Sequence, residues 1–159
     1  MKTLWMLIGP SGSGKSTISK KIVQSNLDKN IVVYSWDALR LEWYGDDYSK
    51  AWKASIDDRQ FGHKAMTAYN QLLDNERNVI VDNVNLTPKS RKKFLQKAQK
   101  LGYQTIGVVF DVPLQTLIDR QLSRPDKTVP THAVAQQFNS FVPPIDGEFD
   151  IILQSKDVV

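Results

Sequence analysis

The segment from Gly9 to Ser16 reads Gly-Pro-Ser-Gly-Ser-Gly-Lys-Ser and fits the pattern G-x-x-x-x-G-K-[ST] at every position. Its glycines let the backbone curl tightly, so that successive N–H groups point at phosphate oxygens. Lys15 can then reach the β- and γ-phosphates of a nucleotide, and the Ser16 hydroxyl can ligate Mg²⁺. We therefore expect a nucleoside-triphosphate site here. Its nucleotide-binding residues would be Gly9, Pro10, Ser11, Gly12, Ser13, Gly14, Lys15, Ser16 and Thr17.

Two carboxylates follow apolar runs. Asp82 comes directly after Val79–Val81, where it could hold the same Mg²⁺ as Ser16. The alternative is an aspartate that only caps the turn. Asp37 follows the run 31–34 and could accept the proton of an attacking hydroxyl, while Arg40, one helical turn on, could hold a nearby phosphate. Here the alternative is a helix-capping aspartate beside an unrelated surface arginine.

Arg120 and Arg124 are four residues apart after Pro113, so they share one face of a predicted helix. Guanidinium groups stabilise the charge that phosphoryl transfer spreads over the equatorial oxygens. With Pro125-Asp126-Lys127 behind them, the two arginines predict a lid over the nucleotide. A solvated basic face is the alternative interpretation.

The stretch 87–100 carries six basic residues and no acidic one. Its first turns are basic, although acids are preferred at a helix start. We take this as a sign of a polyanionic acceptor, with Arg91 contacting one of its phosphates. The alternative is a solvated helix face. Five aromatic residues after the second apolar run could stack bases, but they are also typical of ordinary packing. They are Trp36, Trp43, Tyr44, Tyr48 and Trp52.

These side chains must be positioned by short Val- and Ile-rich runs at 4–8, 31–34, 79–81, 106–110 and 151–153. None alternates with polar residues, which predicts strands buried on both faces of a parallel sheet. Segments of helical periodicity lie between them at 15–24, 61–72, 87–101, from 113, and at 131–138, where Thr131 can cap the last helix. The alternation predicts an α/β sandwich with helices on both faces.

The chain has 159 residues, 41% of them hydrophobic and 24% charged, a net charge of +4 and no cysteine. We expect one domain over residues 1–159, without disulfides or Cys-ligated zinc. No apolar stretch approaches the ~20 residues of a membrane span, and the start is too short for a secretory signal. A cytoplasmic protein is therefore expected, of undetermined oligomeric state.

Taken together, the motifs resemble the kinase domain of phage polynucleotide 5′-kinases. The resemblance covers nearly the whole chain in order: residues 9–17, Asp37 with Arg40, Asp82-Asn83-Val84-Asn85-Leu86-Thr87-Pro88, and residues 109–113 with Arg120, Arg124 and Val129-Pro130. It implies a P-loop kinase fold, a three-layer sandwich around a five-stranded parallel sheet with an Arg-bearing lid. Because the chain ends just after the fifth run, no phosphatase domain is expected.

The resemblance also implies an activity, namely transfer of the ATP γ-phosphate to the 5′-hydroxyl end of DNA or RNA, with Mg²⁺. Lys15 and Ser16 would act at phosphates and metal, Asp37 as general base, and Arg120 and Arg124 at the donor phosphates. Arg40 would contact the acceptor phosphate, with Asn83 and Asn85 also assigned to the acceptor.

Two other functions stay open. A small-molecule kinase acting on a nucleoside, nucleotide, sugar or antibiotic would share every donor-side residue. A nucleotide-dependent binding module without transfer would leave Asp37 and the two lid arginines unexplained.

Overall fold

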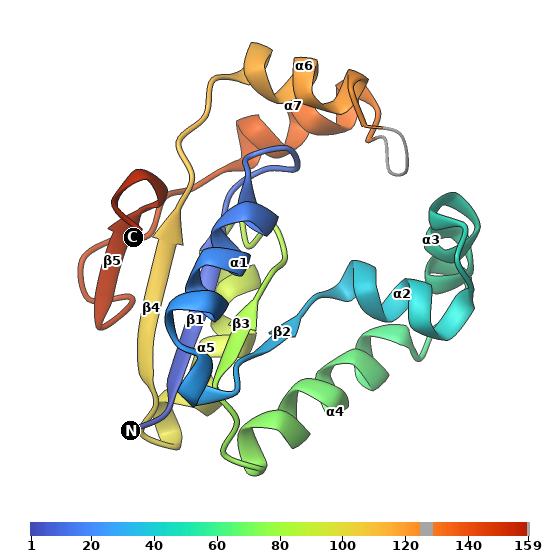
Figure 1. Cartoon of the computed structure of the whole chain (residues 1–159). Helices are drawn as coiled ribbons and strands as arrows, with labels where there is room; N and C mark the ends of the chain where they lie inside the picture. The colour runs from blue at the N-terminus through green and yellow to red at the C-terminus, as the bar shows by residue number, and fades with distance from the viewer. Residues whose placement is uncertain (125–128, 159) are drawn as a thin grey trace.

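A computed structural model describes residues 1–124 and 129–158 of the chain. Its centre is a sheet of five parallel strands in the order β2-β3-β1-β4-β5 (Figure 1). The strands are β1 (Thr3–Ile8), β2 (Val32–Tyr34), β3 (Val79–Val81), β4 (Gln104–Val109) and β5 (Ile151–Gln154). The predicted five-stranded parallel sheet is confirmed, with strand ends that differ from the predicted ones by two residues or fewer.

The prediction that all five strands are buried on both faces is wrong for the two edge strands. β1 and β3 are completely buried, because they have a strand on either side and helices above and below. β2 and β5 form the two edges, where Val33 is 43% and Ile151 37% exposed. An apolar run alone does not distinguish an edge strand from a central one.

Helices cover both faces of the sheet. On one face α1 (Lys15–Ser25) packs Ile18 and Ile22 against alternate side chains of β1 and β4. On the other face α4 (Phe61–Asp74) and α5 (Pro88–Lys100) bury Tyr69 and Phe94 in a second, larger cluster. Every second residue of β1 belongs to each cluster, as the two-residue period of a strand requires.

Capping explains where several helices begin. Thr87 caps α5 by accepting from the Ser90 backbone N–H, with Pro88 at the first helical position, as the sequence predicted. The prediction that Thr131 caps the last helix is wrong, because α7 (Thr131–Ser140) already includes Thr131 and its N-cap residue is Pro130. The helix predicted from Pro113 is α6 (Leu114–Leu122).

Two helices lie in a stretch for which the sequence gives no helix bounds, although Asp37 and Arg40 are predicted to be one helical turn apart. α2 (Trp36–Tyr44) and α3 (Tyr48–Asp57) follow β2 and project beside α4 (Figure 1). Ser35 and Asp47 cap them, because each side chain accepts from the backbone N–H three residues on. Short 3₁₀ turns, η1 (Leu27–Lys29) and η2 (Ser155–Asp157), complete the described elements. Asp37 therefore does not cap α2, and its carboxylate lies in the first turn of the helix instead.

α6 and α7 lie together beyond the end of β1 to which the strand points (Figure 1), the position expected for a lid. Of the predicted lid, Pro125-Asp126-Lys127 lies outside the described residues. Within residues 1–124 and 129–158, none of the helices combines the length and the apolar character needed to cross a membrane.

Candidate active site

The loop between β1 and α1 has the backbone shape that its glycines predict. Gly12 (φ 88°) and Gly14 (φ 95°) adopt left-handed conformations that other residues rarely tolerate. The Lys15 ammonium folds back to donate to the carbonyls of Gly9 (2.9 Å) and Pro10 (3.0 Å). The lysine thus lies over the loop, where a phosphate group would meet it.

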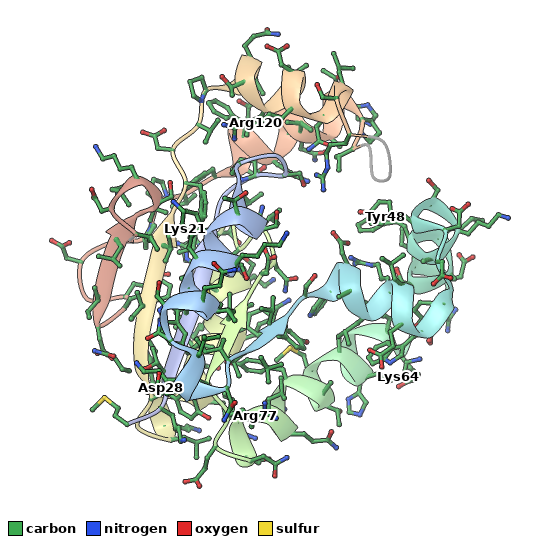
Figure 2. All side chains as sticks on the ribbon, viewed as in Figure 1. Lys21, Asp28, Tyr48, Lys64, Arg77 and Arg120 are labelled. Atoms are coloured by element: carbon green, nitrogen blue, oxygen red, sulfur yellow. The ribbon has the colours of Figure 1, made fainter. Side chains whose placement is uncertain are left out.

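Both lid helices brace this loop. The Ser11 backbone N–H donates to Gln137 Oε1 of α7 (2.8 Å), and Arg120 of α6 donates to the Gly12 carbonyl (2.8 Å). In Figure 2 Arg120 extends from α6 toward the loop. The predicted lid arginine is therefore already in contact with the predicted phosphate loop.

A cavity of about 960 Å³ opens between the loop, the lid helices and the pair α2–α3. The structure brings most of the predicted site residues to its wall: Ser11, Gly12, Gly14, Lys15, Ser16, Asp37, Arg40, Asp82, Asn83, Asn85, Arg120 and Arg124. A second hollow of about 490 Å³ lies behind the loop and includes Ser13 and Thr17 in its wall. Donor-side and acceptor-side residues of the prediction thus meet in one space.

Asp37 is held on the cavity wall by two neighbours. Its Oδ1 accepts from the Arg40 guanidinium (2.8 Å) and from the Tyr48 hydroxyl (3.4 Å). Figure 2 shows Tyr48 extending from α3 toward the middle of the molecule. Burial raises the pKa of Tyr48 to about 12, and the nearby Asp37 charge adds to this. The phenol therefore stays a proton donor at neutral pH, which orients the carboxylate.

Arg40 is fixed from several sides. Its Nε donates to Ser55 Oγ (3.0 Å), and its guanidinium lies 4.2 Å from the ring centroid of Trp52 and 4.9 Å from that of Phe61. The planar guanidinium of arginine can lie flat against an aromatic ring, whereas the ammonium of lysine makes cation–π contacts without this planar stacking. Since only 11% of the side chain is exposed, Arg40 first of all orients Asp37, and it offers its remaining edge to the cavity.

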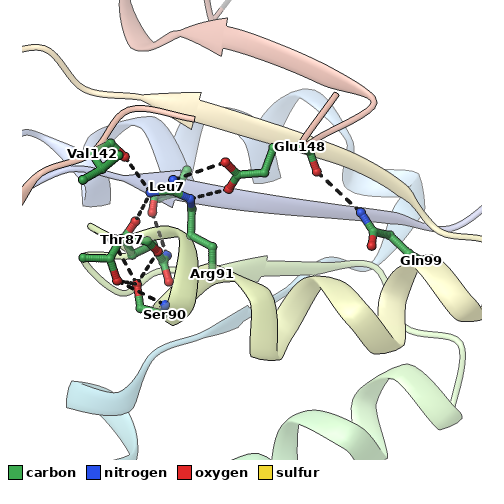
Figure 3. Close-up of polar contacts among 8 residues, drawn as sticks. Leu7, Thr87, Ser90, Arg91, Gln99, Val142 and Glu148 are labelled. Carbon is green, nitrogen blue, oxygen red and sulfur yellow. Dashed lines mark hydrogen bonds and ion pairs between the residues drawn. The ribbon is translucent and has the colours of Figure 1, made fainter. Parts of the chain in front are cut away.

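Arg91 does not take the predicted role in acceptor binding. Its side chain is completely buried and forms an ion pair with Glu148 (Figure 3). The same guanidinium donates to the carbonyls of Asn85 (2.9 Å) and Val142 (2.9 Å). The prediction failed because the basic run was treated as one surface, whereas Arg91 faces the inside of the molecule and closes the segment before β5 onto α5.

The two asparagines after Asp82 hold backbone groups of the site. Asn83 Oδ1 accepts from the Trp36 N–H (2.9 Å), which ties the β3 loop to the start of α2. Asn85 is 3% exposed and donates through Nδ2 to the Leu7 carbonyl (2.7 Å) and the Asn83 carbonyl (3.2 Å). Both line the cavity, and their hydrogen bonds to backbone groups position the segment after β3. Their contact with an acceptor stays a prediction.

Gln137 and Ser55 have no role predicted from the sequence. For Tyr48 and Trp52 the sequence leaves open whether they stack on nucleic-acid bases or serve in ordinary packing. On α3 the signal was available, because Tyr48, Trp52 and Ser55 recur at the spacing of one helix face behind the Asp47 cap. Nothing comparable marks Gln137, whose contact with the loop depends on how the chain folds back.

Ser16 and Asp82 face the cavity together with the loop. Mg²⁺ usually takes one or two protein oxygens and completes its shell with phosphate oxygens and water. A hydroxyl and a carboxylate beside a phosphate cradle therefore suit this ion. Among the described residues no three His, Cys, Asp or Glu side chains gather closely enough to hold a metal by themselves.

Comparison with known proteins places this geometry in a family. Residues 4–144 match the family model described as AAA domain. A protein of Autographa californica nuclear polyhedrosis virus, provisionally named a bifunctional polynucleotide kinase/RNA ligase, is 28% identical over 151 residues. The match covers 89% of this chain, which spans about a fifth (21%) of that relative.

Solved structures share the fold. A gluconokinase from Sinorhizobium meliloti 1021 superposes with a TM-score of 0.64 at 18% identity, over 99% of this chain and 87% of the other. A chain of the Pnkp1/Rnl/Hen1 RNA repair complex superposes with a TM-score of 0.63 at 23% identity, over 87% of this chain and 43% of the other. The fold is that of the P-loop kinases, as the sequence predicted.

Proposed function

The chain belongs to the AAA domain family, and on that premise we propose that it is an ATP-dependent polynucleotide 5′-hydroxyl kinase. It transfers the γ-phosphate of ATP to the 5′-OH end of DNA or RNA. The observation that carries the proposal is that Lys15 of the phosphate loop and Asp37 line one cavity. A similar protein named as a polynucleotide kinase/RNA ligase supports the choice of acceptor.

In the proposed reaction Asp37 removes the proton of the 5′-hydroxyl. The freed oxygen forms a bond to the γ-phosphorus, the bond from that phosphorus to the bridging oxygen breaks, and ADP leaves with the electron pair. Arg40 and Tyr48 orient the carboxylate before the hydroxyl arrives. The arrangement requires no covalent intermediate on the protein.

The donor side stabilises charge. Backbone N–H groups of the loop and the start of α1 receive the phosphates, and Lys15 exchanges its two carbonyl contacts for phosphate oxygens. Arg120 and Arg124 face the same cavity from the lid, where guanidinium groups can meet the equatorial oxygens in the transition state. Ser16 and Asp82 would hold Mg²⁺, which when bound neutralises charge on the β- and γ-phosphates.

The direct test offers γ-labelled ATP and Mg²⁺ to the wild-type protein with a mixture of acceptors: a 5′-hydroxyl oligonucleotide, nucleosides, nucleotides and sugars. Label at the 5′ end of the oligonucleotide is the expected result. Label on a small molecule alone would leave the donor site intact and replace the acceptor. ATP binding without any labelled product would leave a nucleotide-dependent binding module.

A further inference from the structure

The basic residues of α5 point in different directions. Arg91 is buried against Glu148, and Lys97 forms an ion pair with Asp74 (2.8 Å) on the outer side. Lys93 lies two residues after Arg91, which on an α-helix is about 200° around the axis. It therefore faces away from Arg91, and of the α5 cations, all of them described, it is the one on the cavity wall.

Lys93 lies over a rigid aromatic surface. Its ammonium is 4.6 Å from the ring centroid of Trp36 and 5.4 Å from that of Phe94. Trp36 cannot swing away easily, because its indole N–H donates to the Tyr34 hydroxyl (3.0 Å) and its backbone N–H donates to Asn83. Lys93 and the indole of Trp36 thus form a positively charged surface beside Asp37, the proposed general base.

The surroundings of the Lys93 ammonium favour the binding of an anion. Partial burial against the rings lowers the pKa of Lys93 from its ordinary value. Within the described part of the chain no carboxylate lies within ion-pair distance of it. A partly desolvated cation attracts a phosphate more strongly than one in bulk water.

We propose that Lys93 binds a phosphodiester of the acceptor strand, on the 3′ side of the nucleotide whose 5′-hydroxyl meets Asp37. The proposal rests on the proposed function and concerns the same cavity. Trp36 is the residue before Asp37. An acceptor strand that runs from the Asp37 carboxylate along the cavity wall therefore crosses the indole of Trp36 and reaches Lys93. Arg40 is already engaged by Asp37 and Ser55, which leaves Lys93 to hold the strand farther along.

The test uses Lys93→Met, which keeps the aliphatic stem on Trp36 but removes the charge. Its KM for a 5′-hydroxyl decanucleotide should rise about tenfold, as expected for the loss of one hydrogen bond to a charged group. The slope of log KM against log[KCl] should fall by about 0.7, the value for one phosphate contact on a single strand. The KM for ATP should not change.

Lys92→Met is the matched control, because Lys92 is exposed on the same helix and is absent from the cavity wall in the described structure. It should keep the wild-type KM and salt slope. If Lys93→Met does not fold, Lys93→Gln removes the same charge.

An unchanged salt slope in the charge-removed variant overturns the role of Lys93, and so does an equal shift in Lys92→Met. Failure of the wild-type protein to phosphorylate any oligonucleotide is a different result, which overturns the proposed function together with this inference.

Discussion

Arg40 and Arg91 are both paired with a carboxylate, but they lie in opposite surroundings. Arg40 pairs with Asp37 three residues away in the same helix, and both side chains border the cavity. Arg91 pairs with Glu148 across 57 residues of sequence, in the interior. The first pair joins groups that α2 already holds close together, whereas the second joins segments that would otherwise separate.

This difference distinguishes an ion pair that positions a reacting group from one that stabilises the fold. A pair inside one helix adds little to the fold, so its carboxylate can take part in chemistry. A buried pair between distant segments leaves an uncompensated charge and unsatisfied carbonyls when it is broken. We therefore expect changes at the Asp37–Arg40 pair to affect the rate, and changes at the Arg91–Glu148 pair to affect the stability.

The largest expected effect is that of Asp37→Asn. The amide keeps the shape but cannot accept the hydroxyl proton, so kcat should fall by about 10³-fold. ATP affinity, measured by calorimetry, and the free energy of unfolding should stay near wild type. Turnover at the wild-type rate would remove Asp37 from the mechanism. It would also contradict the distinction between the Asp37–Arg40 pair and the Arg91–Glu148 pair.

Arg91→Met is expected to act on the fold instead. Removing one partner of a buried ion pair should cost about 3–5 kcal/mol in the free energy of unfolding, measured by urea denaturation. The kcat per folded molecule should change little, because Arg91 does not reach the cavity. A large loss of rate in a stable variant would contradict this division.

Arg40→Lys should have an intermediate effect on rate. Lysine keeps a charge near Asp37, but it loses the Ser55 contact and the stacking on Trp52. We expect kcat to fall by about tenfold, the value of roughly one charge-assisted hydrogen bond. Thermal denaturation should show that stability changes far less than in Arg91→Met, and the reverse order would contradict the comparison.

The smallest effect is expected at a third pair, on the surface. Asp58 accepts from Lys64 (2.8 Å) and Tyr44 (2.7 Å), which lowers its pKa from 3.8 to about 2. Because the folded pKa lies below the unfolded one, these contacts stabilise the protein above about pH 4 and are lost as the pH falls toward 2.

Asp58→Asn should therefore differ from wild type in unfolding free energy at pH 6, and the difference should shrink between pH 4 and 2. Denaturation curves at several pH values measure it. A difference independent of pH would assign the effect to packing rather than to charge.

The predictable parts of the molecule are those set by local sequence. The loop from Gly9 to Ser16 and the Thr87-Pro88 helix start were predicted because their residue types are dictated by backbone geometry. Asp37 and Asp82 were predicted to lie at one edge of the sheet, because the carboxyl ends of parallel strands meet there. That rule predicts only position, however, and not what each side chain contacts.

The errors arose where long-range packing decides. Arg91 and Lys93 have the same charge and are two residues apart, and charge counting could not tell which one faces the interior. The answer depends on Glu148, which comes from another part of the chain. Which strands lie at the edges of the sheet could not be predicted for the same reason, because strand order depends on the whole sheet.

The placement of the four tryptophans gives the protein an optical property. Trp36 and Trp52 line the cavity and Trp43 packs nearby on Phe61, whereas Trp5 is 7% exposed in the core under α1. Intrinsic fluorescence is therefore concentrated at the part of the cavity that we propose binds the acceptor. An acceptor strand bound as proposed would displace water from two indoles at once. Emission would then report acceptor binding without any attached dye, with Trp5 as an insensitive background.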